Sequence, residues 1–382
     1  MSAYPIYLDY NATTPCDTQV LETMLPYFSQ HFGNASSKGH AHGWHAEDAV
    51  AQSREQVASL IGADAKEIIF TSGATESVNL AIQGLAQQQT IRGKHIITVA
   101  TEHKAVLDVC AHLQGQGYEI THLAVDEFGM IGLEQLEDSI RMDTILIAAM
   151  YANNETGVIH PVADIGRIAQ KHSIPFFCDA TQAVGKIPVD VDADCIDMVA
   201  FSAHKMYGPK GVGALFIKKR NPLLDISPLV FGGGHERKLR SGTLNVPGIV
   251  GMGKAAELCN SMMASEAKRM GELRDYFWQE IGSIKGVEWN GNKDQSLSHI
   301  ANICFTMEGG DKLIKMLSQY LSVSSGSACS SAAVEPSHVL KAMGLSDTKA
   351  HSSIRFSFGR FTTLEEISTA IGEIKKAVLR LS

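Results

Sequence analysis

Three side chains that could do chemistry stand at the ends of apolar runs in the sequence. Lys205 follows the run 198–202, Asp179 ends the run 175–179, and His103 follows the run 95–99. A desolvated lysine amine can form an imine with an aldehyde, and a carboxylate in an apolar setting must be paired or lie in a site. Each residue also has an ordinary explanation: a lysine that snorkels from a strand end, a helix N-cap and a loop histidine.

A fourth feature could bind a phosphate. Gly73, Ala74 and Thr75 follow the apolar run 67–71 and open a helical pattern. Free backbone N–H groups at the start of a helix attract anions, although Thr75 could equally serve as a plain capping hydroxyl. A lysine amine, a carboxylate at a strand end and a phosphate site together match pyridoxal 5'-phosphate (PLP), whose protonated pyridine ring is an electron sink. The order of Asp179 and then Lys205 on successive strand ends strengthens this interpretation.

Cys329 differs from the other cysteines in its surroundings. Its neighbours from 325 to 332 are serine, alanine and glycine, so no bulky side chain is present to bury the thiol. We therefore expect an exposed loop with a reactive thiol, the alternative being a tolerated loop cysteine. The seven cysteines include no C-x-x-C pair, which argues against a zinc or redox site, and their odd number does not suggest a disulfide framework.

An alternation of apolar runs and amphipathic stretches predicts the elements that position these residues. We expect strands at 67–71, 95–99, 144–148, 175–179, 198–202 and 213–217, with helices around 75–88, 103–115 and 161–172. The apolar runs are continuous, which is typical of strands covered on both faces. The pattern predicts an α/β domain with a mostly parallel sheet, in which ligands bind beyond the carboxyl ends of the strands.

Beyond residue 260 the pattern indicates a smaller α+β domain. We expect helices at 264–284, 311–320, 335–343 and 363–380, and strands at 286–289, 300–306 and 353–358. A chain of 382 residues exceeds the size at which one core usually stops growing. We therefore expect a large PLP-binding domain over 14–260 and a small domain, formed by 1–13 and 261–382, that carries the Cys329 loop.

Composition excludes several classes of protein. The chain is 45% hydrophobic and 19% charged, with a net charge of −8, so it has ample core and is a poor candidate for sequence-independent nucleic-acid binding, which needs a basic face. No apolar run is long enough to span a membrane, and Met1–Pro5 lacks the features of a signal peptide, so we expect a cytoplasmic protein. His40, His42 and His45 could bring two imidazoles together, but no third and fourth ligand is defined, and we predict no metal site.

Taken together, these motifs resemble those of the cysteine desulfurases of the NifS/IscS type. These are PLP enzymes in the class V branch of the aspartate-aminotransferase fold, the PLP-dependent transferase fold type I. The resemblance includes YANNETG at 151–157, RSGTL at 240–244, SSGSAC at 324–329 and SSIRFS at 352–357. It extends from LDYNATTP at 8–15 to Phe361-Thr362-Thr363, nearly the whole chain.

The resemblance implies a role for each site residue. Lys205 would hold PLP as a Schiff base and move the Cα proton, and Cys329 would be the nucleophile. The other implied contacts are Gly73, Ala74, Thr75, Ser202 and His204 at the phosphate, Thr243 reaching the phosphate from a partner subunit, His103 on the ring as a proton shuttle, Asp179 at the pyridinium, Gln182 at the ring hydroxyl, Asn154 at the cofactor and the substrate carboxylate, and Arg355 at that carboxylate.

The implied reaction converts L-cysteine to L-alanine and leaves the sulfur on Cys329 as a persulfide. A homodimer would then pass the sulfur to an acceptor protein, either an iron–sulfur scaffold or a thiolation enzyme such as one acting on tRNA. Housekeeping iron–sulfur members carry a longer C-terminal tail, so the acceptor stays open. We also expect the resting Cys329 sulfur to lie about 10 Å or more from Lys205, on a loop that swings.

Three alternatives remain beside this reading. A class V aminotransferase would turn over keto acids and has no need of a loop cysteine, whereas a selenocysteine lyase would keep PLP with another substrate. A non-catalytic scaffold would have lost the chemistry, and intact Lys205, Asp179 and His103 argue against it.

Overall fold

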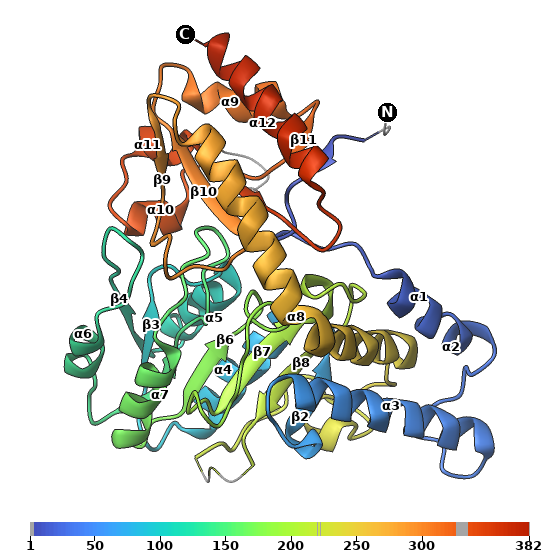
Figure 1. Cartoon of the computed structure of the whole chain (residues 1–382). Coiled ribbons are helices and arrows are strands. Elements are labelled where there is room, and N and C mark those ends of the chain that lie inside the picture. Colours follow the sequence, from blue (N-terminus) through green and yellow to red (C-terminus); the bar gives the residue numbers. More distant parts are fainter. Residues whose placement is uncertain (1–3, 220, 222, 326–334, 382) are drawn as a thin grey trace.

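Figure 1 shows a computed structural model of the protein, in which a broad α/β unit carries a narrower α+β unit at one end. The structure describes residues 4–219, 221, 223–325 and 335–381. The α/β fold class with a mostly parallel sheet, predicted from the sequence, is confirmed.

Within the described residues, the central sheet has seven strands in the order β2-β8-β7-β6-β5-β3-β4. β8 runs antiparallel to β2 and β7, and the other neighbouring pairs are parallel. The strands are β2 (Ile68–Thr71), β3 (His95–Val99), β4 (Glu119–Leu123), β5 (Thr144–Ala148), β6 (Phe176–Asp179), β7 (Met198–Ser202) and β8 (Gly213–Ile217). β4 was not predicted, because it is a partly exposed edge strand whose polar side chains give no apolar run.

Helices cover both faces of this sheet, which explains the continuous apolar runs. In β6, Phe176 and Cys178 pack in one hydrophobic cluster and Phe177 in the other, as expected for alternating side chains. The first cluster includes residues of α1 (Thr18–Met24), α3 (Ala41–Leu60), α6 (Leu133–Asp138), α7 (Val162–Lys171) and α8 (Val246–Ile281). The second includes residues of α4 (Ala74–Gln88) and α5 (Lys104–Gln114). The short α2 (Pro26–Ser29) follows α1.

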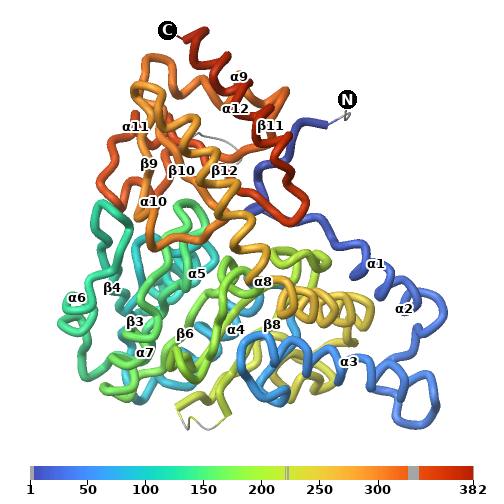
Figure 2. The backbone as a smooth tube through the Cα atoms, in the orientation of Figure 1, coloured from blue at the N-terminus to red at the C-terminus, as the bar shows by residue number. Residues whose placement is uncertain are grey.

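A third hydrophobic cluster forms the core of the α+β unit and combines Leu8 with residues from 273 to 378. Its strands are β1 (Ile6–Tyr7), paired in parallel with β11 (Leu321–Ser322), and the antiparallel set β9 (Val287–Trp289), β10 (Ile300–Phe305) and β12 (Ser353–Ser357). Its helices are α9 (Leu313–Leu317), α10 (His338–Ala342), α11 (Asp347–His351) and α12 (Leu364–Leu379). In Figure 2 the blue N-terminal segment accordingly lies beside the orange and red C-terminal part.

Helix α8 connects the two units without a break, and it was expected to begin only at residue 264. It has 36 residues and is capped by Asn245, whose side chain accepts from the N–H of Gly248. The glycines in its first half hid it from the sequence pattern, but they allow close packing on α3. A Cβ on Gly253 would lie 2.7 Å from the Cα of Ser53. The predicted boundary at 260 falls inside this helix, and the division into two domains stays a prediction.

The histidines of the α3 region have local structural roles. His40 caps α3, its Nδ1 accepting from the N–H of Gly43 at 3.2 Å, and the rings of His31 and His45 lie 4.3 Å apart. Among the described residues, no group of three or more histidine, cysteine or acidic side chains is placed to hold a metal ion. In the same part of the chain, no helix is long and apolar enough to cross a membrane.

Candidate active site

A cavity of about 780 Å³ lies beyond the carboxyl ends of β2, β3, β5, β6 and β7. The predicted site residues that line it are Gly73, Ala74, Thr75, His103, Asn154, Asp179, Gln182, Ser202, His204, Lys205 and Arg355. Thr243 is exposed and does not line this cavity in the chain itself. Cys329 lies outside the described residues, and so does its predicted distance from Lys205. One cavity thus gathers residues that are far apart in the sequence.

One end of the cavity is suited to an anion. Gly73, with φ of 156°, precedes α4, and no described side chain forms a capping hydrogen bond with this helix. A Cβ on Gly213 would lie 2.6 Å from the Cα of Gly73, so the neighbouring strand can approach only because it carries glycine there. The uncapped backbone N–H groups at this helix start can therefore serve a phosphate.

Arg240 and His204 add to this end. Arg240 donates from Nε to Glu76 at 2.8 Å, and the second oxygen of Glu76 accepts from the N–H of Ser72 at 2.7 Å. The ring of His204 bonds to the hydroxyl of Thr13 at 3.1 Å. Burial, followed by the charge of Lys205, lowers the pKa of His204 to about 4. His204 is therefore neutral at pH 7 and has one N–H to donate.

Asp179 and His103 also line the cavity. Asp179 is buried at the end of β6, and its carboxylate accepts from the N–H of Thr181 at 3.0 Å. His103 caps α5, its Nδ1 accepting from the N–H of Ala105 at 3.1 Å, which leaves the ring proton on Nε2. Burial lowers the pKa of His103, although the charge of Asp179 opposes this shift. A neutral imidazole and a carboxylate thus line the same space.

Glu102, beside His103, was not predicted as a site residue. Its side chain is buried and accepts from the N–H of Met150 at 2.6 Å, while its second oxygen has no partner in the described structure. Burial, followed by the negative charge of Asp179, raises the pKa of Glu102 well above its usual range. The surroundings of Glu102 therefore favour its protonated form. A charged residue directly after a buried strand was the available sequence signal.

Lys205 lies at the end of the short 3-10 turn Ala203–Lys205 that follows β7. Its ammonium donates to the backbone carbonyl of Asn11 and to that of Ala12, the latter at 2.9 Å. Asn11 was not predicted as a site residue, although it belongs to the segment LDYNATTP at 8–15. Its side chain is buried, donates to the carbonyl of Asn154 at 2.9 Å and bonds to the ring of His299 at 3.1 Å. The N-terminal segment therefore forms one wall of the site.

Arg355 and Asn154 line the same cavity. The guanidinium of Arg355 donates from Nη2 to Asp9 at 2.6 Å and from Nη1 to the carbonyl of Asn154 at 3.0 Å. Its Nε and the side-chain oxygen of Asn154 are buried and have no hydrogen-bond partner among the described residues. An unpaired N–H and an unpaired amide oxygen beside a cavity can be satisfied by a ligand or by water. The carboxylate of an amino acid could be bound by Arg355 at this place.

The residues of this cavity fit PLP as the sequence predicted. The uncapped helix start matches the phosphate, the carboxylate of Asp179 matches a protonated ring nitrogen, and the amine of Lys205 matches an aldehyde. The flat ring of His103 lines the same space. These matches concern residue types and shared location, and the individual roles remain predictions.

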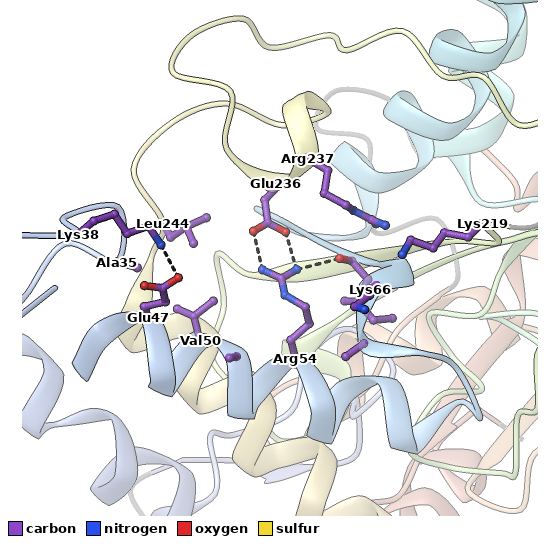
Figure 3. Close-up of a pocket in the computed structure, with 13 residues that line it drawn as sticks. Ala35, Lys38, Glu47, Val50, Arg54, Lys66, Lys219, Glu236, Arg237 and Leu244 are labelled. Atoms are coloured by element: carbon purple, nitrogen blue, oxygen red, sulfur yellow. Dashed lines mark hydrogen bonds and ion pairs between the residues drawn. The ribbon is translucent and has the colours of Figure 1, made fainter. Parts of the chain in front are cut away.

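A second cavity, of about 700 Å³, is shown in Figure 3. Arg54 of α3 points to Glu236 and forms a two-pronged ion pair with it at 2.7 and 2.6 Å. Glu236 also accepts from the N–H of Phe70 at 2.7 Å, and φ is positive at Glu236, Arg237 and Lys238. This ion pair fixes the segment that leads to Thr243 against α3 and β2.

Comparisons with known proteins identify the family of this chain. The family model for class-V aminotransferases matches residues 6–369. A protein named cysteine desulfurase IscS from Anaeromyxobacter dehalogenans is 52% identical over 378 residues, covering 99% of this chain and 93% of its own length. One of the same name from Klebsiella pneumoniae is 50% identical over 379 residues, with the same coverage.

Solved structures with similar folds include two that bear on the site. One titled NifS-like protein has a TM-score of 0.91 and 37% identity, covering 99% of this chain and 100% of its own. Another, titled SspA in complex with cysteine, has a TM-score of 0.84 and 38% identity, covering 94% of this chain and 100% of its own.

Proposed function

Because the chain belongs to the class-V aminotransferase family and, within it, to the cysteine desulfurases, we propose that it converts L-cysteine to L-alanine and transfers the sulfur to Cys329. The family, the enzyme class and the PLP dependence predicted from the motifs are confirmed by this membership. The observation that carries the proposal is that Lys205, Asp179 and the incompletely satisfied Arg355 line one cavity.

Lys205 holds the cofactor and moves the substrate Cα proton. When bound, PLP supplies an electron sink that acidifies the Cα proton of the amino acid joined to it. The carbonyls of Asn11 and Ala12 orient the lysine amine, and the carboxylate of Asp179 is the group that keeps the ring nitrogen protonated. His103 is neutral, so its ring can stack on the cofactor and carry a proton on Nε2.

Arg355 and Asn154 orient L-cysteine by its carboxylate. Asp9 and the carbonyl of Asn154 hold the guanidinium in place, so little side-chain freedom is lost when substrate binds. Arg355 lines the cavity, and its guanidinium is the cation that would pair with the substrate carboxylate. This contact holds the amino acid by its carboxylate, while Lys205 acts on its Cα proton.

The sulfur step is proposed for Cys329. The thiolate of Cys329 attacks the substrate sulfur, an S–S bond forms, and the C–S bond of the substrate breaks. The carbon skeleton takes a proton and leaves as L-alanine, so cysteine plus the Cys329 thiol give alanine plus a Cys329 persulfide. The persulfide sulfur then passes to an acceptor protein for iron–sulfur cluster assembly or thiolation. We also propose that the enzyme is a cytoplasmic homodimer in which Thr243 reaches the partner's phosphate site.

The proposal is tested by incubating the purified, PLP-loaded enzyme with L-cysteine and a reductant. Alanine and sulfide should be released in equal amounts, and Lys205→Ala should release neither. Transamination of keto acids in place of sulfide release would favour an aminotransferase. Turnover of selenocysteine without turnover of cysteine would favour a selenocysteine lyase.

A further inference from the structure

Glu155 is a buried carboxyl that the proposed chemistry does not use. It stands next to Asn154 in a turn held by Asn153, whose side-chain oxygen accepts from the N–H groups of Glu155 and Thr156 at 2.8 and 2.9 Å. The carbonyl of Glu155 also accepts from the amide of Asn302 on β10 at 3.1 Å. The backbone on both sides of the Asn154 side chain is therefore fixed, and Glu155 does not line the cavity itself.

The carboxylate of Glu155 accepts a hydrogen bond from the hydroxyl of Ser337 at 2.5 Å, across 182 residues of sequence. The same hydroxyl caps α10 by accepting from the N–H of Leu340 at 3.2 Å. Ser337 is buried, so both bonds are shielded from water. A hydroxyl that donates to a carboxylate and accepts from a helix N–H has its orientation determined from both sides.

The residue after Ser337 makes a second contact with the α/β unit. The ring of His338 bonds to the backbone carbonyl of Glu102 at 2.9 Å, directly beside His103 of the candidate site. Val339, Leu340 and Met343 pack in a small cluster with Ala350, against which Val125 of the α/β unit also packs. The start of α10 is thus attached to two loops of the α/β unit, one carrying Asn154 and the other His103.

The environment of Glu155 favours its neutral form. Burial raises the pKa of Glu155 to about 7, although the hydroxyl of Ser337 and the charges of Arg355 and Lys104 oppose the shift. Arg355 comes from β12 and Lys104 from the start of α5. Because an ionised carboxylate is the stronger acceptor, the bond from Ser337 strengthens as pH rises through about 7.

We propose that Glu155 and Ser337 are a pair of positioning residues that fix the start of α10 relative to the substrate-carboxylate groups Asn154 and Arg355. The inference rests on the proposed desulfurase function, because Ser337 follows residues 326–334, which by sequence contain the nucleophile Cys329. Fixing Ser337 therefore fixes one end of the segment that carries the thiol, and so determines how far the thiol can reach toward the substrate. Misplacement of a reacting group by about 1 Å can cost on the order of 100-fold in rate.

The test compares Ser337→Ala with two matched variants. Ser337→Thr keeps a hydroxyl for Glu155, and Ser346→Ala removes the analogous serine cap of α11, whose hydroxyl accepts from the N–H of Lys349 at 3.3 Å. Four properties are measured for each PLP-loaded protein. They are the amount of bound PLP, the affinity for L-alanine (monitored by cofactor absorbance), kcat and KM for L-cysteine, and hydrogen exchange of the 337–343 amides.

We expect Ser337→Ala to lower kcat roughly tenfold or more, since the thiol would lose a fixed reach, while PLP loading and L-alanine binding stay native. Ser337→Thr should restore kcat, and Ser346→Ala should leave it unchanged. Amides 337–343 should exchange faster in Ser337→Ala alone. Equal losses in Ser337→Ala and Ser346→Ala, or an unchanged kcat in Ser337→Ala, would overturn the proposal.

Glu155→Gln gives a readout that a purely structural role would not move. Glutamine keeps a carbonyl acceptor for Ser337 but cannot ionise, so the difference between its kcat–pH profile and that of the wild type should appear near pH 7 and grow as pH rises. Parallel profiles would contradict the assignment. Wild-type enzyme that releases no alanine from cysteine would instead refute the proposed function, and the exchange of the 337–343 amides would still report on the Ser337 contact.

Discussion

Replacing Arg355 with lysine tests the substrate-binding end of the site. The guanidinium has three partners to serve: Asp9 at 2.6 Å, the carbonyl of Asn154 at 3.0 Å, and the substrate carboxylate of the proposed reaction. A lysine ammonium is a single point that cannot serve all three. Loss of one hydrogen bond to a charged group costs about 1.5–3 kcal/mol, which corresponds to roughly 10- to 150-fold weaker binding. The KM for L-cysteine should rise by such a factor, with PLP absorbance unchanged.

The assay combines steady-state kinetics with spectral titration by L-alanine, because KM equals the dissociation constant only when chemistry is slow. Arg269→Lys is the matched control. Arg269 also donates from both Nη atoms, to the carbonyls of Gly359, Arg360 and Thr362, but it does not line the cavity. Its substitution should leave KM unchanged. An unchanged KM in Arg355→Lys, or an equal rise in both variants, would refute the reasoning.

Three further predictions concern the cofactor and the stability of the fold. Borohydride should fix PLP to Lys205 alone, shown by peptide mapping, and Lys205→Ala should form no such adduct; an adduct on another lysine would contradict the assignment. Burial lowers the pKa of His160 to about 4, so the unfolded chain takes up a proton first, and this residue's contribution to stability falls by up to roughly 3 kcal/mol as pH drops from 6.5 to 4. In urea titrations His160→Leu should make the pH dependence shallower by that amount, because His204 and His103 contribute to the same pH range. Glu236→Gln leaves Arg54 without its charged partner and should lower the free energy of unfolding by roughly 3 kcal/mol, whereas Glu119→Gln, at an exposed ion pair, should change it little.

The strand-end residues could be predicted from the sequence because their signal is local. Asp179 and Lys205 each follow a continuous apolar run, and in a parallel sheet the carboxyl ends of such runs meet at one edge. The turn of small residues at Gly73 was readable for the same reason. These residues line the same cavity, as the α/β pattern required.

The residues that were missed act through contacts between distant parts of the chain. Asn11 bonds to His299 across 288 residues, and Glu155 bonds to Ser337 across 182 residues, so no periodicity or spacing reports either pair. The first half of α8 was missed because glycines that permit close packing on α3 lower the helix propensity of that stretch. Tertiary packing, which a single sequence does not display, decides all three cases.

The location of the transferred sulfur tests the central claim most directly. PLP-loaded enzyme is given L-cysteine without reductant, free thiols are alkylated, and the digested protein is mapped by mass spectrometry beside a measurement of alanine. We predict one added sulfur atom on the peptide of Cys329, in step with the alanine formed, and neither alanine nor a sulfur adduct on that peptide in Cys329→Ser. Sulfur on another cysteine, or sustained alanine release by Cys329→Ser at the wild-type rate, would contradict the account.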